Sequence, residues 1–274
     1  MKQLHWKSSA LILTSLCAVC MLARPVAAQS YLVTDLGTIS GPGGFTQAFG
    51  INNSGQVVGA TDTSQGLTHP FLWTPAVPNG MTGSLKDLGV LSQFTISNQA
   101  NAINDAGVVV GFAGLDNGNT HAVSFTNGVL KDLGVLPNFN LNSNATAINK
   151  SGQIVGVSAG TTIEHAFLCS AGKMTDLGTL PGGVNSTASG INAVGEIVGE
   201  ADNAVGTFVP FLFVNGVMHD MSGPGGLPGT PKAINDAGQV TGVLAIPIII
   251  PDPGNPEPGV LLHAYLWTPA TPNG

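Results

Sequence analysis

A short block recurs along the whole chain, and its near-constant spacing is what most constrains the fold. The clearest copy is His165-Ala166-Phe167-Leu168, followed at once in the chain by a segment ending in Asp176-Leu177-Gly178. The aspartate of this second element lies at positions 35, 87, 132 and 176, and a degenerate copy starts at Asp220, so the steps are 52, 45, 44 and 44 residues. Self-similarity at a fixed period of this size indicates a repeat architecture.

Each unit is predicted to form four short strands. The first ends at an Ile-Asn pair, and a four-residue connection closing in glycine follows, as in Asn149 to Gly152. Asparagine favours the start of a turn, and glycine supplies the positive φ that a hairpin of this length needs. The second strand is of the type Ile154-Val155-Gly156, the third is the His-Ala-Phe-Leu element, and the fourth runs into Asp-Leu-Gly. No helical period of 3.6 persists, so almost no helix is expected.

Four strands in every ~44 residues match the blade length of a β-propeller. The sequence therefore predicts an all-β fold, a β-propeller of about five four-stranded blades. The units span approximately residues 38–91, 92–136, 137–180, 181–222 and 223–274. Residues 31–37 read as a fourth strand without three before it, and the last unit has three strands, so the N-terminal strand is expected to close the ring. The alternative is an incomplete propeller fragment of a longer repeat protein.

The first 28 residues have the features of a signal peptide. Lys2 and Lys7 precede an apolar run that is too short for a membrane span, and Val26-Ala27-Ala28 offers a cleavage site before Gln29. The remaining 29–274 form the repeat domain and contain five lysines, no arginine and all 15 acidic residues, so their formal charge is −10. This balance disfavours nucleic acid and anionic lipid as partners. We expect a secreted or cell-surface bacterial protein without a membrane span in the mature chain.

The recurring histidines and aspartates could act as acid–base groups. However, an active site is formed once in a protein, so a residue that recurs in the units is expected to have a structural role in each of them. We expect Asp87, Asp132 and Asp176 to accept backbone N–H groups and the histidines to bridge neighbouring strands. His219 is unrepeated, yet strand alternation places it on the opposite face from Asp220, which disfavours a catalytic pair.

Other candidate sites are weak. The segment 116–119 resembles part of a calcium loop without its glutamate, so a plain turn is favoured. Cys169 is the one cysteine after residue 28, and a buried thiol is favoured over a nucleophile. Aromatic or apolar residues seven places after the aspartates could form a ligand platform around one face, but they are expected to wedge between adjacent blades: Phe94, Phe139 and Leu227. The unrepeated carboxylates that could form a glycosidase pair are Asp62, Glu164, Glu196, Glu200, Asp202 and Glu257. Glu196 and Glu200 are expected at a solvated edge, too far apart for one sugar.

Two departures from the repeat predict loops. One lies at 74–85 in the first unit. The other lies at 246–259 in the fifth unit, where the prolines are expected to exclude the segment from a central strand ladder and to leave a projecting loop.

The motifs Asp-Leu-Gly-Thr-Leu, Ile-Asn-x-x-Gly-x-Val-Val-Gly and His-Ala-Phe resemble the HAF-repeat family of probable extracellular bacterial proteins. The likeness covers roughly residues 31–274, with 176–199 as its clearest copy, and the fourth unit departs from it at Val209-Pro210-Phe211 and Asp220-Met221-Ser222. The resemblance implies export and tandem repetition and carries no catalytic residues.

The sequence thus assigns no catalytic, cofactor-binding or metal-ligating residue and no cofactor. It favours a non-enzymatic scaffold that binds an extracellular protein or a glycan. The alternative is a secreted carbohydrate-active propeller, either a glycoside hydrolase with two converging carboxylates or a lectin-like module with several equivalent sites.

Overall fold

The computed structural model describes residues 32–92, 98–222, 228–250 and 257–269, and it divides the chain into a unit of residues 1–35 and a unit of residues 36–274. The predicted signal peptide lies outside the described residues. Every regular element in them is a strand, which confirms the all-β prediction. The described residues contain no helix with the length and hydrophobicity to cross a membrane.

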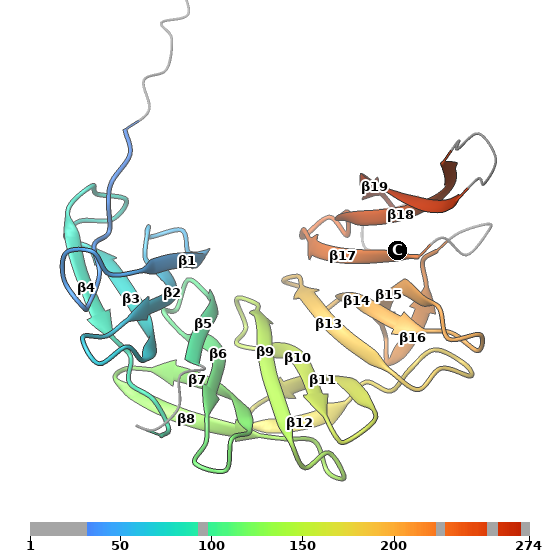
Figure 1. Cartoon of the computed structure of the whole chain (residues 1–274), viewed down its shortest axis with the longest axis horizontal. Helices are drawn as coiled ribbons and strands as arrows, with labels where there is room; N and C mark the ends of the chain where they lie inside the picture. The colour runs from blue at the N-terminus through green and yellow to red at the C-terminus, as the bar shows by residue number, and fades with distance from the viewer. Residues whose placement is uncertain (1–31, 93–97, 223–227, 251–256, 270–274) are drawn as a thin grey trace, which may run out of the picture. The chain divides into compact units, whose positions relative to one another are not determined.

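The strands form five separate antiparallel sheets in chain order (Figure 1). The first sheet contains β1 (Thr46–Ile51), β2 (Val57–Asp62), β3 (Thr68–Pro75) and β4 (Gly83–Asp87). The second contains β5 (Asn98–Ile103), β6 (Val109–Gly114), β7 (Thr120–Thr126) and β8 (Val129–Gly134). The third contains β9 (Asn142–Ile148), β10 (Ile154–Ala159), β11 (Glu164–Ser170) and β12 (Lys173–Asp176). The fourth contains β13 (Ser186–Ile191), β14 (Ile197–Asp202), β15 (Phe208–Val214) and β16 (Val217–Asp220), and the fifth contains β17 (Gly229–Ile234), β18 (Val240–Ile250) and β19 (Glu257–Trp267).

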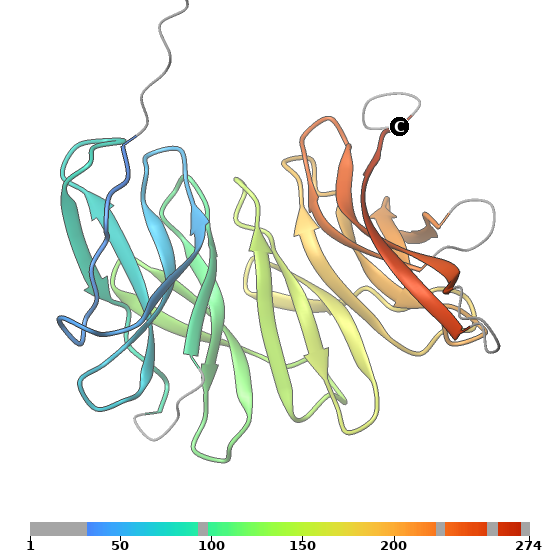
Figure 2. The ribbon, with the colours of Figure 1, turned by 45° about the horizontal axis from the view of Figure 1, so that its top comes forward.

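Turn chemistry explains why each sheet is a meander of adjacent hairpins (Figure 2). The first strand of every sheet ends at the isoleucine of Ile-Asn, and the glycine that closes the following turn has positive φ, as at Gly152 with 80°. The Asn127-Gly128 pair has φ of 52° and 84°, the values of the predicted two-residue hairpin turn.

A β-bulge in the first strand explains the glycine of the second. In the third sheet the register shifts so that Thr146 is the extra residue, and a Cβ at Gly156 would lie 1.9 Å from the Asn144 carbonyl oxygen. Only glycine permits this approach of two backbones.

The core is divided among the spaces between consecutive sheets. One apolar cluster joins Val155 and Ala166 of the third sheet to Ile197 and Phe211 of the fourth, and Leu177 of the connecting segment completes it. Similar clusters lie between the other consecutive sheets. Each sheet therefore depends on its neighbours for burial, as expected of a repeat protein.

Residues 32–37 carry no strand, which differs from the predicted N-terminal strand at 31–37. The fifth sheet accordingly has three strands in the described residues. A strand forms only where a neighbour pairs with its backbone N–H and C=O groups. Among the described strands, β17–β19 pair only with one another.

The predicted projecting loop at 246–259 is wrong at 246–250 and at 257–259, which are strand, whereas residues 251–256 lie outside the described residues. Residues Ala245–Ile250 continue β18 and pair with Glu257–Leu262 of β19, and Pro247 lies opposite Val260. β17 pairs with β18 only as far as Leu244. The Ala245 N–H still donates to the Pro228 oxygen at 2.9 Å, but past Ala245 β18 pairs with β19 alone in the part of the chain that the structure describes. The missing N–H of Pro247 therefore removes no ladder bond there. The loop predicted at 74–85 is shorter than expected, because its ends belong to β3 and β4.

Candidate functional site

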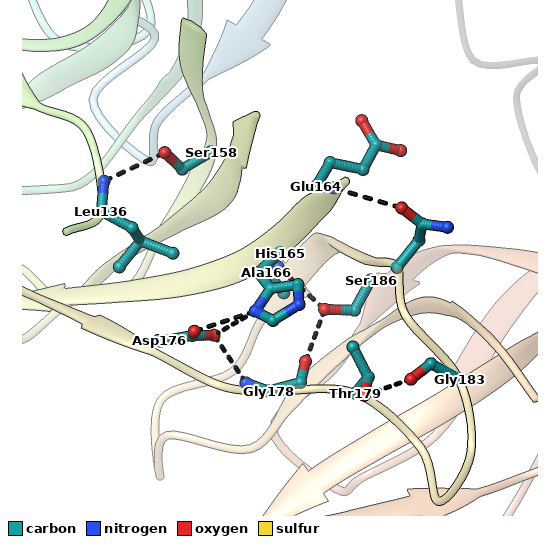
Figure 3. Close-up of polar contacts among 11 residues, drawn as sticks. Leu136, Ser158, Glu164, His165, Ala166, Asp176, Gly178, Thr179, Gly183 and Ser186 are labelled. Atoms are coloured by element: carbon teal, nitrogen blue, oxygen red, sulfur yellow. Dashed lines mark hydrogen bonds and ion pairs between the residues drawn. The ribbon is translucent and has the colours of Figure 1, made fainter. Parts of the chain in front are cut away.

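The recurring histidine and aspartate join the third and fourth strands of a sheet. In the third sheet His165 Nδ1 lies 2.8 Å from Asp176 Oδ2, and the other carboxylate oxygen accepts the Gly178 N–H at 2.7 Å (Figure 3). The first and second sheets repeat the contact, His69 with Asp87 at 2.7 Å and His121 with Asp132 at 2.9 Å. This geometry confirms the expected structural bonds of both residue types.

The fourth sheet keeps only half of this arrangement. Asp220 Oδ1 accepts the Ser222 N–H at 2.7 Å, as its counterparts do. At the register position of His165, however, the fourth sheet has Val209, which is fully buried. In the first four sheets the aspartate therefore accepts a backbone N–H of the following turn, whereas the fourth sheet omits the histidine.

A second set of polar residues links one sheet to the next. The asparagine of each Ile-Asn pair accepts two backbone N–H groups of its own turn, as Asn149 does from Ser151 and Gln153. Its Nδ2 then donates to the backbone oxygen of the equivalent asparagine in the following sheet, at 3.0 to 3.2 Å. The bonds run from Asn52 to Asn104, from Asn104 to Asn149, from Asn149 to Asn192 and from Asn192 to Asn235. We call this series the asparagine ladder.

Most of the unrepeated carboxylates that the sequence singles out serve the fold. Asp62 accepts hydrogen bonds from Ser40 and from the Phe45 N–H. Burial raises the pKa of Asp202, but bonds donated by Asn185 and Val184 outweigh it and hold that pKa below its ordinary value. Asp202 is therefore a charged structural acceptor.

The prediction of a solvated edge is wrong for Glu196. This residue is buried, and Asn192 Nδ2 donates to its carboxylate at 2.5 Å. It occupies the place that Gln153 has beside Asn149, so the ladder asparagine explains its burial. The side chain of Glu257 lies outside the described residues.

Glu164 is the remaining candidate, and it lines an open hollow of about 340 Å³ between the third and fourth sheets. Its N–H is held by Asn185 Oδ1 at 3.2 Å, while its carboxylate points away from the His165–Asp176 contact and has no hydrogen-bond donor among the described residues (Figure 3). Burial raises the pKa of Glu164, and the negative charge of Glu200 adds to the effect. A carboxyl group with a perturbed pKa in a concave site is a candidate for function.

The hollow combines polar groups with an aromatic side chain. Thr161 and Thr162 come from the β10–β11 turn, and Phe208 from the start of β15. Phe208 is 38% exposed, so part of its ring is open to a ligand. Hydroxyl groups, a carboxyl group and an exposed ring at one opening suit a ligand that has both polar groups and an apolar face.

Glu200 does not belong to this hollow. It accepts a bond of 2.7 Å from Thr230 of the fifth sheet. Two carboxylates on one hollow, the arrangement expected of a glycosidase, are therefore not formed by Glu164 and Glu200, although the two interact electrostatically.

A second open hollow of about 400 Å³ lies between the first and second sheets. Lys86 reaches it with its ammonium group 5.6 Å from the centre of the Phe125 ring. Asp105 also lines it, but Asn53 donates two bonds to that carboxylate, which lower the pKa of Asp105. A lysine already placed over a ring and a carboxylate already bonded leave fewer groups here for a ligand than at Glu164.

The other sequence candidates have structural places. Asp116 accepts a bond from Ser92, and residues 116–118 form a turn, as expected. Cys169 is buried, and burial raises the pKa of its thiol, as suits a structural residue. Among the described residues no three histidine, cysteine, aspartate or glutamate side chains are grouped to hold a metal ion.

Phe139 fulfils the wedge prediction. It is buried between the second and third sheets, with its ring centre 4.8 Å from that of His165. Phe94 and Leu227 lie outside the described residues. His219 is exposed and lies opposite Leu212, whereas Asp220 lies opposite Phe211, so their side chains alternate as predicted.

Sequence reasoning missed the ladder and the hollow. The recurrence of asparagine after isoleucine signals the turn, but nothing local shows that the side chain also reaches the next sheet. Glu164 and Phe208 occupy equivalent register positions in successive units, opposite Ala159 and Asp202 respectively, where the first two units have Thr68 and Thr120. That departure was the available signal.

No family model and no curated protein matches this chain.

Proposed function

We propose that this chain is an exported HAF-repeat protein that serves as a non-enzymatic, extracellular or cell-surface binding scaffold. The observation that carries the proposal is that the repeated polar residues are engaged in holding strands and sheets together. His165, Asp176 and Asn149 are typical, since each is bonded to its own sheet or to the next. A residue that makes the same hydrogen bond in successive units has a structural role. Recognition of a specific ligand therefore depends on the positions where the units differ.

The same consideration supports a β-propeller of about five blades as the arrangement of the sheets. Consecutive four-stranded meanders that share one type of contact are what a propeller requires. Small-angle X-ray scattering of residues 29–274 would distinguish a closed disc from an extended array.

We place the ligand site of the scaffold at the hollow beside Glu164, and a glycan is the ligand class that fits it best. Sugars present hydroxyl groups for threonine and carboxylate partners and a C–H face for an aromatic ring, and the hollow offers Thr162, Glu164 and Phe208. The hollow is unrepeated, so one site per chain is expected rather than several equivalent ones.

Binding of residues 29–274 to a glycan array and to purified envelope polysaccharide, followed by calorimetry, tests the proposal. We expect Phe208→Ala to weaken binding about tenfold, the effect of losing ~1.4 kcal/mol. Val205→Ala, in an exposed turn, is the matched control and should bind as the parent does. Absence of any glycan binding, or equal binding by the Phe208 variant, would refute this site.

The second candidate function is glycan hydrolysis, and one observation favours it. A carboxyl group whose pKa is raised by burial suits a general acid, and Glu164 is such a group. Glu200 lies outside the hollow that Glu164 lines, so hydrolysis would need a second carboxyl group from another part of the chain. Release of reducing ends that disappears in Glu164→Gln and persists in Glu200→Gln would establish this activity. Binding without hydrolysis would support the scaffold.

A further inference from the structure

The contact between consecutive sheets has three recurring parts. The first is the asparagine ladder. The second is a donor at the β-bulge of the first strand in the second, third and fourth sheets: Asn101 Nδ2 donates to the Ala145 oxygen at 2.7 Å, Thr146 Oγ1 to the Ala188 oxygen at 2.8 Å, and Ser189 Oγ to the Pro231 oxygen at 2.7 Å. The bulge residue of the first sheet is Phe49, which has no side-chain donor. The third is an apolar contact in which Val58 and Leu72 of one sheet pack on Ile103 of the next. Each contact thus has a donor side and an acceptor side.

The outer face of the first sheet has the features of the acceptor side. Ile51 is 69% exposed, whereas its equivalents Ile103 and Ile191 are 7% and 9% exposed beneath the preceding sheet. The Asn104 oxygen accepts two hydrogen bonds, from Gly107 and from the ladder. The Asn52 oxygen accepts only that of Gly55 among the described residues, so its second acceptor position is open.

The outer face of the fifth sheet has the features of the donor side. Leu266 is 66% exposed, whereas Leu212 at the same register position of the fourth sheet is 8% exposed. The Nδ2 of Asn235 donates to Gln239, and its second hydrogen has no partner in the described part of the chain. Lys232 is the bulge residue, exposed, and supplies a donor as Thr146 and Ser189 do.

We propose that these two faces bind one another between copies of this chain, so that the fifth sheet of one copy packs on the first sheet of the next. In this contact Asn235 Nδ2 donates to the Asn52 oxygen, Lys232 donates to the Ala48 oxygen, and Leu266 covers Ile51. The occupant is a second copy, because both halves of the contact are on one chain and yet Ile51 and Leu266 are both exposed within it. The four contacts inside the chain provide the pattern of the contact. The contact therefore requires the five sheets to form an open array and not the closed disc of a complete propeller. A head-to-tail contact of this type builds rings or filaments. The inference concerns assembly and does not depend on the proposed ligand.

Two variants and their mixture test the proposal. Ile51→Lys blocks the acceptor face and leaves the donor face intact, and Leu266→Glu does the reverse. Both positions are exposed, so both variants should fold, which circular dichroism and thermal unfolding can verify. Sedimentation velocity should show concentration-dependent association of residues 29–274, about tenfold or more weakening in each variant, and a one-to-one dimer when the two variants are mixed. Val205→Lys, exposed and on neither face, should associate as the parent does.

The mixture is the decisive measurement, because only a head-to-tail contact lets two blocked chains form a dimer that grows no further. A parent chain that stays monomeric at millimolar concentration overturns the proposal. If both variants then unfold at lower temperature than the Val205 control, the two faces meet within one chain instead. Association that both variants retain also overturns it. None of these results depends on glycan binding, so failure here and failure of the proposed function are separate.

Discussion

The third and fourth units solve one packing problem in two ways. At the start of β11 the Ala166 N–H donates to Ser186 Oγ at 2.9 Å, and that hydroxyl donates to the Gly178 oxygen at 2.6 Å. The equivalent residue of β15 is Pro210, which has no N–H, and the residue facing it from the next sheet is Gly229, which has no hydroxyl. Donor and acceptor are present together or missing together. This pairing teaches that each unit needs hydrogen-bond partners for its buried backbone groups. The alanine of the His-Ala-Phe motif, together with a facing serine, is one way to supply them.

The second unit follows the third, because Ser143 bonds the Ala122 N–H and the Gly134 oxygen. The first unit has Pro70 in place of the alanine, and the facing residue is Asn98, whose Nδ2 donates to the Thr68 oxygen instead. The residue that follows the histidine position and the residue that faces it from the next sheet therefore vary together in more than one pair of sheets.

Removing the serine should give the largest loss of stability. Ser186→Ala leaves a buried N–H and a buried carbonyl without partners, which should cost ~2–4 kcal/mol of unfolding free energy. Chemical denaturation with a double-mutant cycle measures it. Adding Ala166→Pro removes the orphaned donor, as the fourth unit does, and should recover part of the loss. If the unfolding free-energy losses of Ser186→Ala and Ala166→Pro simply add in the double variant, the two positions are not coupled and the interpretation is contradicted.

The two aspartates should differ in cost. Asp176→Ala loses the bond to Gly178 and the contact with His165, whereas Asp220→Ala loses only the bond to Ser222. We expect about 1–3 kcal/mol for the first variant and about half as much for the second, from the same denaturation curves. An equal loss of unfolding free energy in the two variants would mean that the His165–Asp176 contact contributes nothing to stability.

Replacing the histidine by its fourth-unit counterpart should be cheaper still. His165→Val gives up a partly exposed ion-pair geometry and gains an apolar side chain beside Phe139, so its cost should stay below ~1 kcal/mol. Thermal unfolding measures the difference, with His165→Asn as a polar control. A loss of stability larger than that of Asp176→Ala would show that His165 does more than hold β11 to β12.

The smallest effect should come from Glu164, which stands where the fourth unit has Phe208. Its folded-state pKa is raised, so ionisation disfavours the folded state, and the penalty develops as pH rises from the unfolded pKa through the folded one. Glu164→Gln should therefore raise the melting temperature slightly at pH 7 and leave it unchanged near pH 3. Glu200→Gln should give part of the same gain, because it removes the neighbouring charge. A Glu164 variant that is less stable at pH 7 would show that its carboxylate is needed by the fold.

Much of the fold follows from adjacent residues. Alternation marks the strands, Asn and Gly mark the turns, and the recurrence of Asp-Leu-Gly marks the units, because each feature is fixed within one hairpin. The segment at 246–250 was misread for the same reason. Whether Pro247 breaks a ladder depends on how far β17 extends beside it, which no local pattern records.

The sequence by itself determined a repeat of short strands, the four-residue turns and the places where the units differ. Only the tertiary structure decided which residues of the neighbouring sheet contact the positions where the units differ. It brings Ser186 onto Ala166, extends each ladder asparagine to the next sheet, and places Phe208 beside Glu164 in one hollow. The physical reason is that these contacts join different sheets, and their partners lie 20 or more residues apart. Their pairing therefore depends on how two faces come together rather than on any residue alone.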